Sequence, residues 1–185
     1  MKKIILDLCG GTGAWSKPYA EAGYDVRIVT TPYHDVRSYH PPYPVHGVLA
    51  APPCTVFSTV NQRKRTDREM LDGLIIVANC LRIIAQCEPK WWALENVIGR
   101  LSSFMGKPVM IFQPWQYGDP WTKRTGLWGK FNPLVKRPVP PKYAAVSSGR
   151  ILTGERRQER RTKRSALTRA ITPPGFASAF FNANP

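Results

Sequence analysis

Two side chains in this sequence could perform covalent and acid–base chemistry: the thiol of Cys54 and the carboxyl of Glu95. Cys54 follows Pro52 and Pro53, whose restricted backbone would hold the thiol at a defined angle. Glu95 follows a short apolar run over residues 91–94, and a carboxyl beside a dry wall can hold and donate a proton. Taken singly, the cysteine is more typical of a protein core than of a reactive site, and the glutamate is equally typical of a helix cap or an ion pair.

A glycine-rich turn is the third chemical feature. Cys9-Gly10-Gly11-Thr12-Gly13 follows an apolar run over residues 3–8 and precedes a stretch of helical character over residues 14–22. In this context the backbone can approach a nucleotide closely, next to a helix N-terminus. The alternative is that the glycines only make a tight turn between a strand and a helix.

The elements that must position these residues alternate between strand and helix. The apolar patterns predict a mostly parallel, doubly wound α/β sheet in three layers, because strand–helix–strand successions form right-handed parallel units. Ligands bind at the carboxyl ends of such strands, so the glycine turn, Cys54 and Glu95 would lie at one edge of the sheet. We expect strands over 3–8, 26–29, 47–51, 91–94, 109–112 and 125–128, and helices over 14–22, 68–87 and 176–184.

Composition excludes several classes of protein. The four cysteines, Cys9, Cys54, Cys80 and Cys87, form no CxxC pair and lie near no histidine cluster, which argues against a zinc site and a disulfide framework. No run approaches about 20 apolar residues, and the apolar run after Met1 is too short for a signal peptide. We therefore expect a soluble, cytoplasmic protein with no metal, no disulfide and no membrane partner.

The charge points to a polyanionic partner. The chain of 185 residues has 27 Lys and Arg against 12 Asp and Glu, a formal charge of +15. Residues 136–169 hold 11 basic and 2 acidic side chains, and the cluster Gln62-Arg63-Lys64-Arg65 follows Cys54. A nucleophilic thiol followed by basic residues suits chemistry on a nucleic acid. The alternative for the C-terminal charge is a solvated tail.

In their order along the chain, these motifs resemble those of the DNA cytosine-5 methyltransferases. The resemblance covers about residues 3–131 and 168–184, and its Pro-Pro-Cys and Glu-Asn-Val pair is specific to the family. Two later motifs resemble the family's basic motif, in a compact phage-type form, and its terminal helix. The motifs are Asp7–Gly13, Pro52–Ser58, Glu95–Val97, Tyr117–Thr125 with Leu127–Trp128, and Thr172–Ala177.

The resemblance implies a Rossmann-like, class I S-adenosylmethionine-dependent methyltransferase fold and a covalent mechanism. The Cys54 thiolate would add to C6 of a flipped-out cytosine while Glu95 holds N3 and the exocyclic amine. C5 would then take the methyl group from S-adenosylmethionine, leaving S-adenosylhomocysteine, and lose its proton. The catalytic residues implied are Cys54, Glu95, Asn96, which would brace the Cys54 loop, and Lys123 and Arg124.

The resemblance also implies binding residues. Cys9 stands where the family has an aromatic ring, so we expect Trp15 to pack on the cofactor adenine and Asp35 to meet the adenine amine. The expected cofactor-binding residues are Asp7, Leu8, Cys9, Gly10, Gly11, Thr12, Gly13, Trp15, Asp35 and Pro52. The expected DNA-binding residues are Ser58, Arg63, Lys64, Arg65, Arg156, Arg157, Arg160 and Arg161.

The short chain leaves room for only a small DNA-recognition region. We expect a catalytic core over residues 1–131, a short basic DNA-recognition segment over residues 132–170, called the basic segment below, and a C-terminal helix over 171–185 that packs back on the core. Arginines in the basic segment suit phosphates and guanine edges, so we expect a monomer that reads a short site in double-stranded DNA. The alternatives are an RNA cytosine-5 methyltransferase and a DNA-binding module with a degenerate cofactor pocket.

Overall fold

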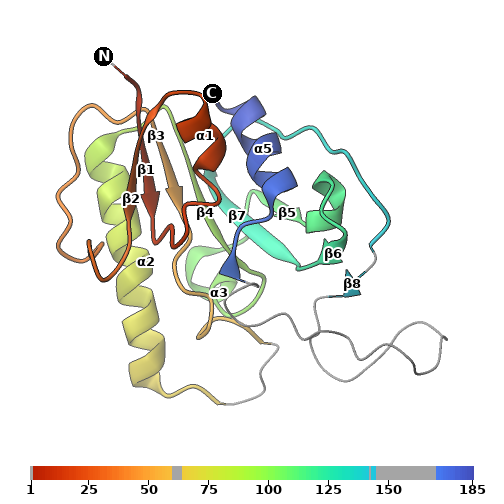
Figure 1. The fold of residues 1–185 in the computed structure, drawn as a ribbon. Coiled ribbons are helices and arrows are strands. Elements are labelled where there is room, and N and C mark those ends of the chain that lie inside the picture. The colour runs from red at the N-terminus through yellow and green to blue at the C-terminus, as the bar shows by residue number, and fades with distance from the viewer. Residues whose placement is uncertain (1, 60–63, 142, 145–169) are drawn as a thin grey trace.

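The computed structural model describes residues 2–59, 64–141, 143–144 and 170–185. Figure 1 shows a central sheet with helices against both of its faces. The elements follow in the order β1 (Ile4–Leu8), α1 (Lys17–Glu21), β2 (Asp25–Val29), β3 (Gly47–Ala50), α2 (Asp67–Cys87), β4 (Trp91–Val97), α3 (Ser102–Met105), β5 (Met110–Phe112), the 3₁₀ turn η1 (Pro114–Tyr117), β6 (Trp121–Thr122), β7 (Thr125–Lys130), β8 (Tyr143–Ala144) and α5 (Pro174–Ala183).

The main sheet has the strand order β2-β1-β3-β4-β7-β5. The four strands from β2 to β4 are parallel, and β7 runs antiparallel between β4 and β5. Strand β2 lies on one side of β1, and β3 and β4 lie on the other side. The order in which successive strands are added to the sheet therefore reverses beside β1. These observations confirm the predicted Rossmann-like, doubly wound and mostly parallel α/β fold.

Two hydrophobic cores lie on opposite faces of the sheet, which gives the three predicted layers. One core joins α2 and α3 to strand residues such as Leu6, Val48 and Leu94. The other joins α1 and α5 to Ile5, Leu49 and other residues of the same strands. Neighbouring strand residues therefore enter different cores, as expected for a sheet covered on both faces.

Helix α2 is the crossover between β3 and β4. It begins at a capping box in which Thr66 and Glu69 satisfy each other's backbone N–H groups, and its last turn ends at Glu88, where φ is 43°. Its core-facing side chains include Val77, Cys80 and Ile83. Among the described residues, α2 alone is long and apolar enough to cross a membrane by length and composition, and here it packs on the sheet.

Helix α5 closes the opposite face. Phe176 is fully buried and stacks on Phe112, with ring centroids 3.9 Å apart and an interplanar angle of 6°. Asn132 binds the helix C-terminus, because its backbone N–H and side-chain amide donate to Asn184 Oδ1 and Ala183 O. The C-terminal helix therefore packs back on the core; the boundaries at residues 132 and 171 stay predictions.

The structure corrects two predicted elements. Helix α1 spans only residues 17–21, because the chain from Cys9 to Ser16 is occupied by turns with positive φ at Cys9, Gly11 and Gly13. Strand β4 continues to Val97 rather than ending at residue 94, because β7 pairs with it beyond the end of β3. The short elements α3, η1, β6 and β8 were not predicted.

Candidate active site

The glycine turn, Cys54 and Glu95 lie at the same edge of the sheet. In the parallel registers Leu8 pairs with Ala50, and Ala50 pairs with Leu94. The turn therefore begins directly after β1, Cys54 follows β3, and Glu95 lies one residue beyond the end of the β3–β4 pairing. This edge includes the reversal of winding beside β1, where doubly wound sheets bind their ligands.

Asp7 lies fully buried beneath the glycine turn. Its Oδ2 accepts a hydrogen bond from Ser16 Oγ at 2.6 Å, and Oδ1 has no protein partner. Burial raises the pKa of this carboxyl to about 6, because it disfavours the charged form more than the Ser16 hydrogen bond favours it. A Cβ at Gly10 would lie 2.4 Å from the Asp7 carboxyl carbon, so only glycine fits above it.

Cys9 packs against the core on the α2 side of the sheet. Its sulfur interacts with the thiol of Cys80 on α2, and this hydrogen bond lowers the pKa of Cys9 against the opposing effect of burial. The hydrogen bond with Cys9, together with burial, raises the pKa of Cys80. Cys80 and Cys87 are core residues, as predicted, and all four cysteines are free thiols.

Residues 52–58, called the Cys54 segment below, end in a tight turn that begins at Cys54. The backbone N–H groups of Phe57 and Ser58 both donate to the Cys54 carbonyl, at 3.1 and 2.9 Å. Asn96 Nδ2 donates to the Pro52 carbonyl at 3.0 Å, so the amide next to Glu95 holds the start of the segment. Cys54 itself is partly exposed.

Glu95 is paired with a cation brought from a distant part of the chain. Lys123, between β6 and β7, donates from Nζ to Glu95 Oε1 at 3.1 Å, and less than a fifth of either side chain is exposed. Burial by itself would lower the pKa of Lys123, but the charges of Glu95 and Cys54 outweigh it and raise the pKa. Lys123 is therefore a cation that pairs with the candidate acid and whose charge also interacts with the candidate nucleophile.

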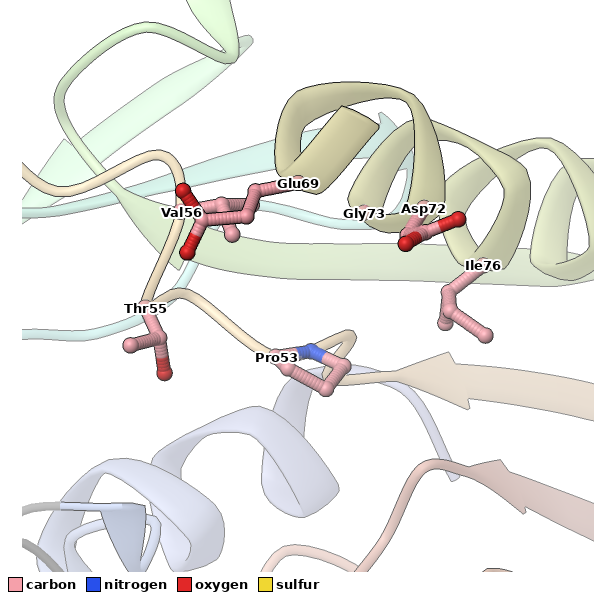
Figure 2. Close-up of a pocket in the computed structure, with 7 residues that line it drawn as sticks. All are labelled: Pro53, Thr55, Val56, Glu69, Asp72, Gly73 and Ile76. Carbon is pink, nitrogen blue, oxygen red and sulfur yellow. The ribbon is translucent and has the colours of Figure 1, made fainter. Parts of the chain in front are cut away.

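A cleft opens beside the Cys54 segment, between it and the first turns of α2 (Figure 2). Its volume is about 290 Å³. Sequence reasoning missed this cleft, because its lining comes from two segments whose separate patterns indicate only a loop and a core helix. The lining residues are Pro53, Thr55, Val56, Glu69, Asp72, Gly73 and Ile76.

A family model for the C-5 cytosine-specific DNA methylases matches residues 14–110, just over half of the chain. The chain belongs to this family. The matched region includes Cys54, Glu95 and Asn96. It begins after the glycine turn and ends before Lys123, so the contact between Lys123 and Glu95 is known from the structure.

The fold of this C-5 cytosine-specific DNA methylase is similar to that of a solved structure described as a DNA modification methyltransferase encoded within an Escherichia coli prophage. The TM-score is 0.51 at 20% sequence identity over 70% of this chain. This chain spans only 47% of the length of that protein. No curated protein matches the sequence. The structural likeness supports the fold.

Two predicted cofactor residues of the methylase already have protein partners. Trp15 is 2% exposed, and its ring packs against Phe176 and Phe180 with centroids 5.8 and 5.4 Å apart. Asp35 forms a close ion pair with Arg37, whose hydrogen bonds lower the pKa of the carboxyl. The charge of Arg37 also interacts with that of Asp72, a residue that lines the cleft.

The predicted DNA-binding residues of the methylase are only partly described. Lys64 is exposed, whereas Arg65 donates to the Thr55 carbonyl at 3.0 Å. Ser58 accepts a bond at its carbonyl from Arg100, and the exposed Arg124 follows Lys123. Outside the described residues lie Arg63, Arg156, Arg157, Arg160 and Arg161. Within the described ranges, no group of three or more His, Cys, Asp or Glu could hold a metal ion.

Proposed function

We propose that the protein is an S-adenosylmethionine-dependent DNA cytosine-5 methyltransferase that works through a covalent Cys54 adduct. One observation carries the proposal: Lys123 donates to Glu95, and its charge interacts with Cys54, at the edge of the sheet where this fold binds ligands. The proposed nucleophile, the proposed acid and the cation come from three segments of the chain. Family membership supports cytosine in DNA as the substrate.

The glycine turn suits a cofactor of this kind. Asp7 has a buried oxygen without a protein partner, and a Cβ at Gly11 would meet nothing within 4 Å. An acceptor below an open turn fits a ligand with a cationic amino group, and we assign its binding to residues 7–13, Pro52 and Asp35. When bound, S-adenosylmethionine supplies an electrophilic methyl group.

Cys54, Glu95 and Lys123 have separate roles in the proposed reaction. The Cys54 thiolate adds to C6 of the cytosine as Glu95 gives a proton to N3, so the electron pair of the C5–C6 double bond becomes available at C5. After C5 is methylated, a base removes the proton from C5, the C6–S bond breaks, the thiolate leaves, and N3 returns its proton to Glu95. Lys123 stabilises the Cys54 thiolate before it adds and after it leaves, and the Glu95 carboxylate while N3 carries the proton.

The substrate cytosine must leave the DNA stack. C5 and C6 cannot be reached inside a duplex, and flipping the base out costs about a few kcal/mol. The proposed contacts to phosphates are Ser58, Lys64 and Arg124, together with the arginines of the basic segment and Arg63. Cationic side chains along the strand would offset part of this cost through phosphate contacts.

The decisive experiment follows methyl transfer and the covalent adduct separately. Duplex DNA incubated with the protein and methyl-labelled cofactor, then digested to nucleosides, should yield 5-methylcytosine, and faster than tRNA does. A duplex containing 5-fluorocytosine should trap the wild-type protein, because the fluorine cannot leave as the proton does. Cys54→Ala should not be trapped, whereas the core-thiol variant Cys87→Ala should be. No transfer by cofactor-bound protein, or trapping of Cys54→Ala, would refute the proposal; faster transfer to tRNA would make RNA the substrate.

A further inference from the structure

The Cys54 segment is held at its far end by Arg100, a residue that no motif singled out. The backbone N–H of Arg100 donates to the Phe57 carbonyl at 2.9 Å. Its guanidinium donates from Nη1 to the next carbonyl, that of Ser58, at 2.8 Å. Arg100 therefore donates hydrogen bonds to two successive carbonyls of the turn that begins at Cys54.

Gly99, the residue before Arg100, allows the two segments to approach closely. A Cβ at Gly99 would lie 2.2 Å from the Phe57 carbonyl oxygen, so a side chain at this position would push the two segments apart. Phe57 is itself fully buried in the core against α2. The Arg100 contact thus acts on a turn that is already fixed on its inner side.

These hydrogen bonds lead directly to the nucleophile. The N–H groups of Phe57 and Ser58, whose carbonyls Arg100 binds, donate to the carbonyl of Cys54. Glu95 and Asn96 lie shortly before Arg100 in the chain, and Asn96 holds the other end of the segment at Pro52. Residues 95–100 therefore include the candidate acid and form hydrogen bonds with both ends of the Cys54 segment.

We propose that Arg100 is a positioning residue for the proposed methyl transfer: through Phe57 and Ser58 it fixes the Cys54 thiol relative to Glu95. The inference rests on the proposed function. Arg100 acts on the rate of adduct formation and leaves DNA affinity unchanged, because its guanidinium binds the protein's own backbone. Misplacement of a reacting group by about 1 Å can cost about 100-fold in rate.

The test compares Arg100→Met and Arg100→Lys with Arg68→Met, which removes an exposed arginine from the surface of α2. The readouts are the rate of trapping by 5-fluorocytosine duplex, the Kd for unmodified duplex at several salt concentrations, and the melting temperature. Arg100→Met should slow trapping about 10- to 100-fold with Kd within about twofold. Arg100→Lys, which can still donate to the Ser58 carbonyl, should recover most of the rate, and Arg68→Met should match the wild type.

Each other outcome has a definite meaning. Trapping of Arg100→Met within twofold of the wild type, or no recovery in Arg100→Lys, overturns the positioning role. Weaker DNA binding with a shallower salt dependence makes Arg100 a phosphate contact instead. If Arg100→Met does not fold, Gly99→Ala decides, since it should slow trapping through displacement of Phe57. Absence of trapping in the wild type refutes the proposed function itself.

Discussion

At the scale of single residues, protonation of Asp7, which lies beneath the glycine turn, makes the free energy of unfolding depend on pH. Its pKa is raised to about 6 by burial, so between about pH 4 and 6 the folded protein binds a proton that the unfolded chain does not. The free energy of unfolding contributed by Asp7 therefore increases as the pH falls through this window, and the buried charge costs about 3 kcal/mol above it.

The first prediction compares the wild type with Asp7→Asn, which keeps the shape but cannot ionise. Between pH 7 and pH 4 the wild type should gain up to about 3 kcal/mol of unfolding free energy relative to the variant, measured by urea unfolding at each pH. The comparison removes the contributions of other titrating groups, which both proteins share. Parallel pH profiles would show that Asp7 is not the group that takes up the proton.

A second residue-scale prediction concerns Lys123. Replacing Lys123 with Met removes the cation beside Cys54 and should slow alkylation of Cys54 by iodoacetamide at pH 7.5 by about 3- to 10-fold, because an opposite charge favours the thiolate. Lys123→Arg keeps the charge and should react like the wild type. Peptide mapping by mass spectrometry would separate Cys54 from the other partly exposed cysteine, Cys9. Equal rates in all three proteins would mean that the cation does not activate the thiol.

At the scale of elements, α5 is a structural part of the hydrophobic core on one face of the sheet. Phe176→Ala should lower the free energy of unfolding by about 3–5 kcal/mol, since it removes a fully buried ring stacked on Phe112 and packed beside Trp15. Ile171→Ala, at a position 42% exposed before the helix, is the matched control and should cost much less. Urea unfolding checks both. A similar, small loss in the two variants would mean that α5 contributes little to stability.

The elements also show why the sequence predicts β4 too short. The apolar run ends at Leu94, and Glu95 and Asn96 are polar, which is typical of a loop. In the structure β7 pairs with these residues, Glu95 with Leu127 and Asn96 with Gly126. Placing the acid within a strand, with pairing on one side only, fixes its backbone more firmly than a loop would.

At the scale of the whole molecule, the basic charge remains the main property to be tested. Replacing Arg156, Arg157, Arg160 and Arg161 with glutamine should weaken DNA binding and reduce the slope of log K against log salt by about 0.9 for each phosphate that these arginines neutralise in the wild type. Fluorescence anisotropy with labelled duplex at several salt concentrations measures both. An unchanged slope would identify the basic segment as a solvated tail.

The sequence by itself determined the order of the motifs, the six main strands, the long crossover helix and the edge of the sheet where Cys54 and Glu95 meet. These follow from local spacing, because the periodicity of apolar residues and the position of glycine and proline depend on near neighbours. Parallel connection then places successive strand ends together. The sequence therefore sufficed to predict the family, and it supplied the candidate reacting residues, which stay predictions.

Only the tertiary structure decided which groups surround them. It pairs Glu95 with Lys123, packs the buried Trp15 against Phe176 and Phe180, and brings Arg100 onto the turn at Cys54. Each of these contacts joins segments that lie far apart in the chain, and a hydrogen bond or ion pair between them leaves no periodic trace in the sequence. Their geometry depends on how the sheet and its two covering layers pack, which the chain settles only on folding.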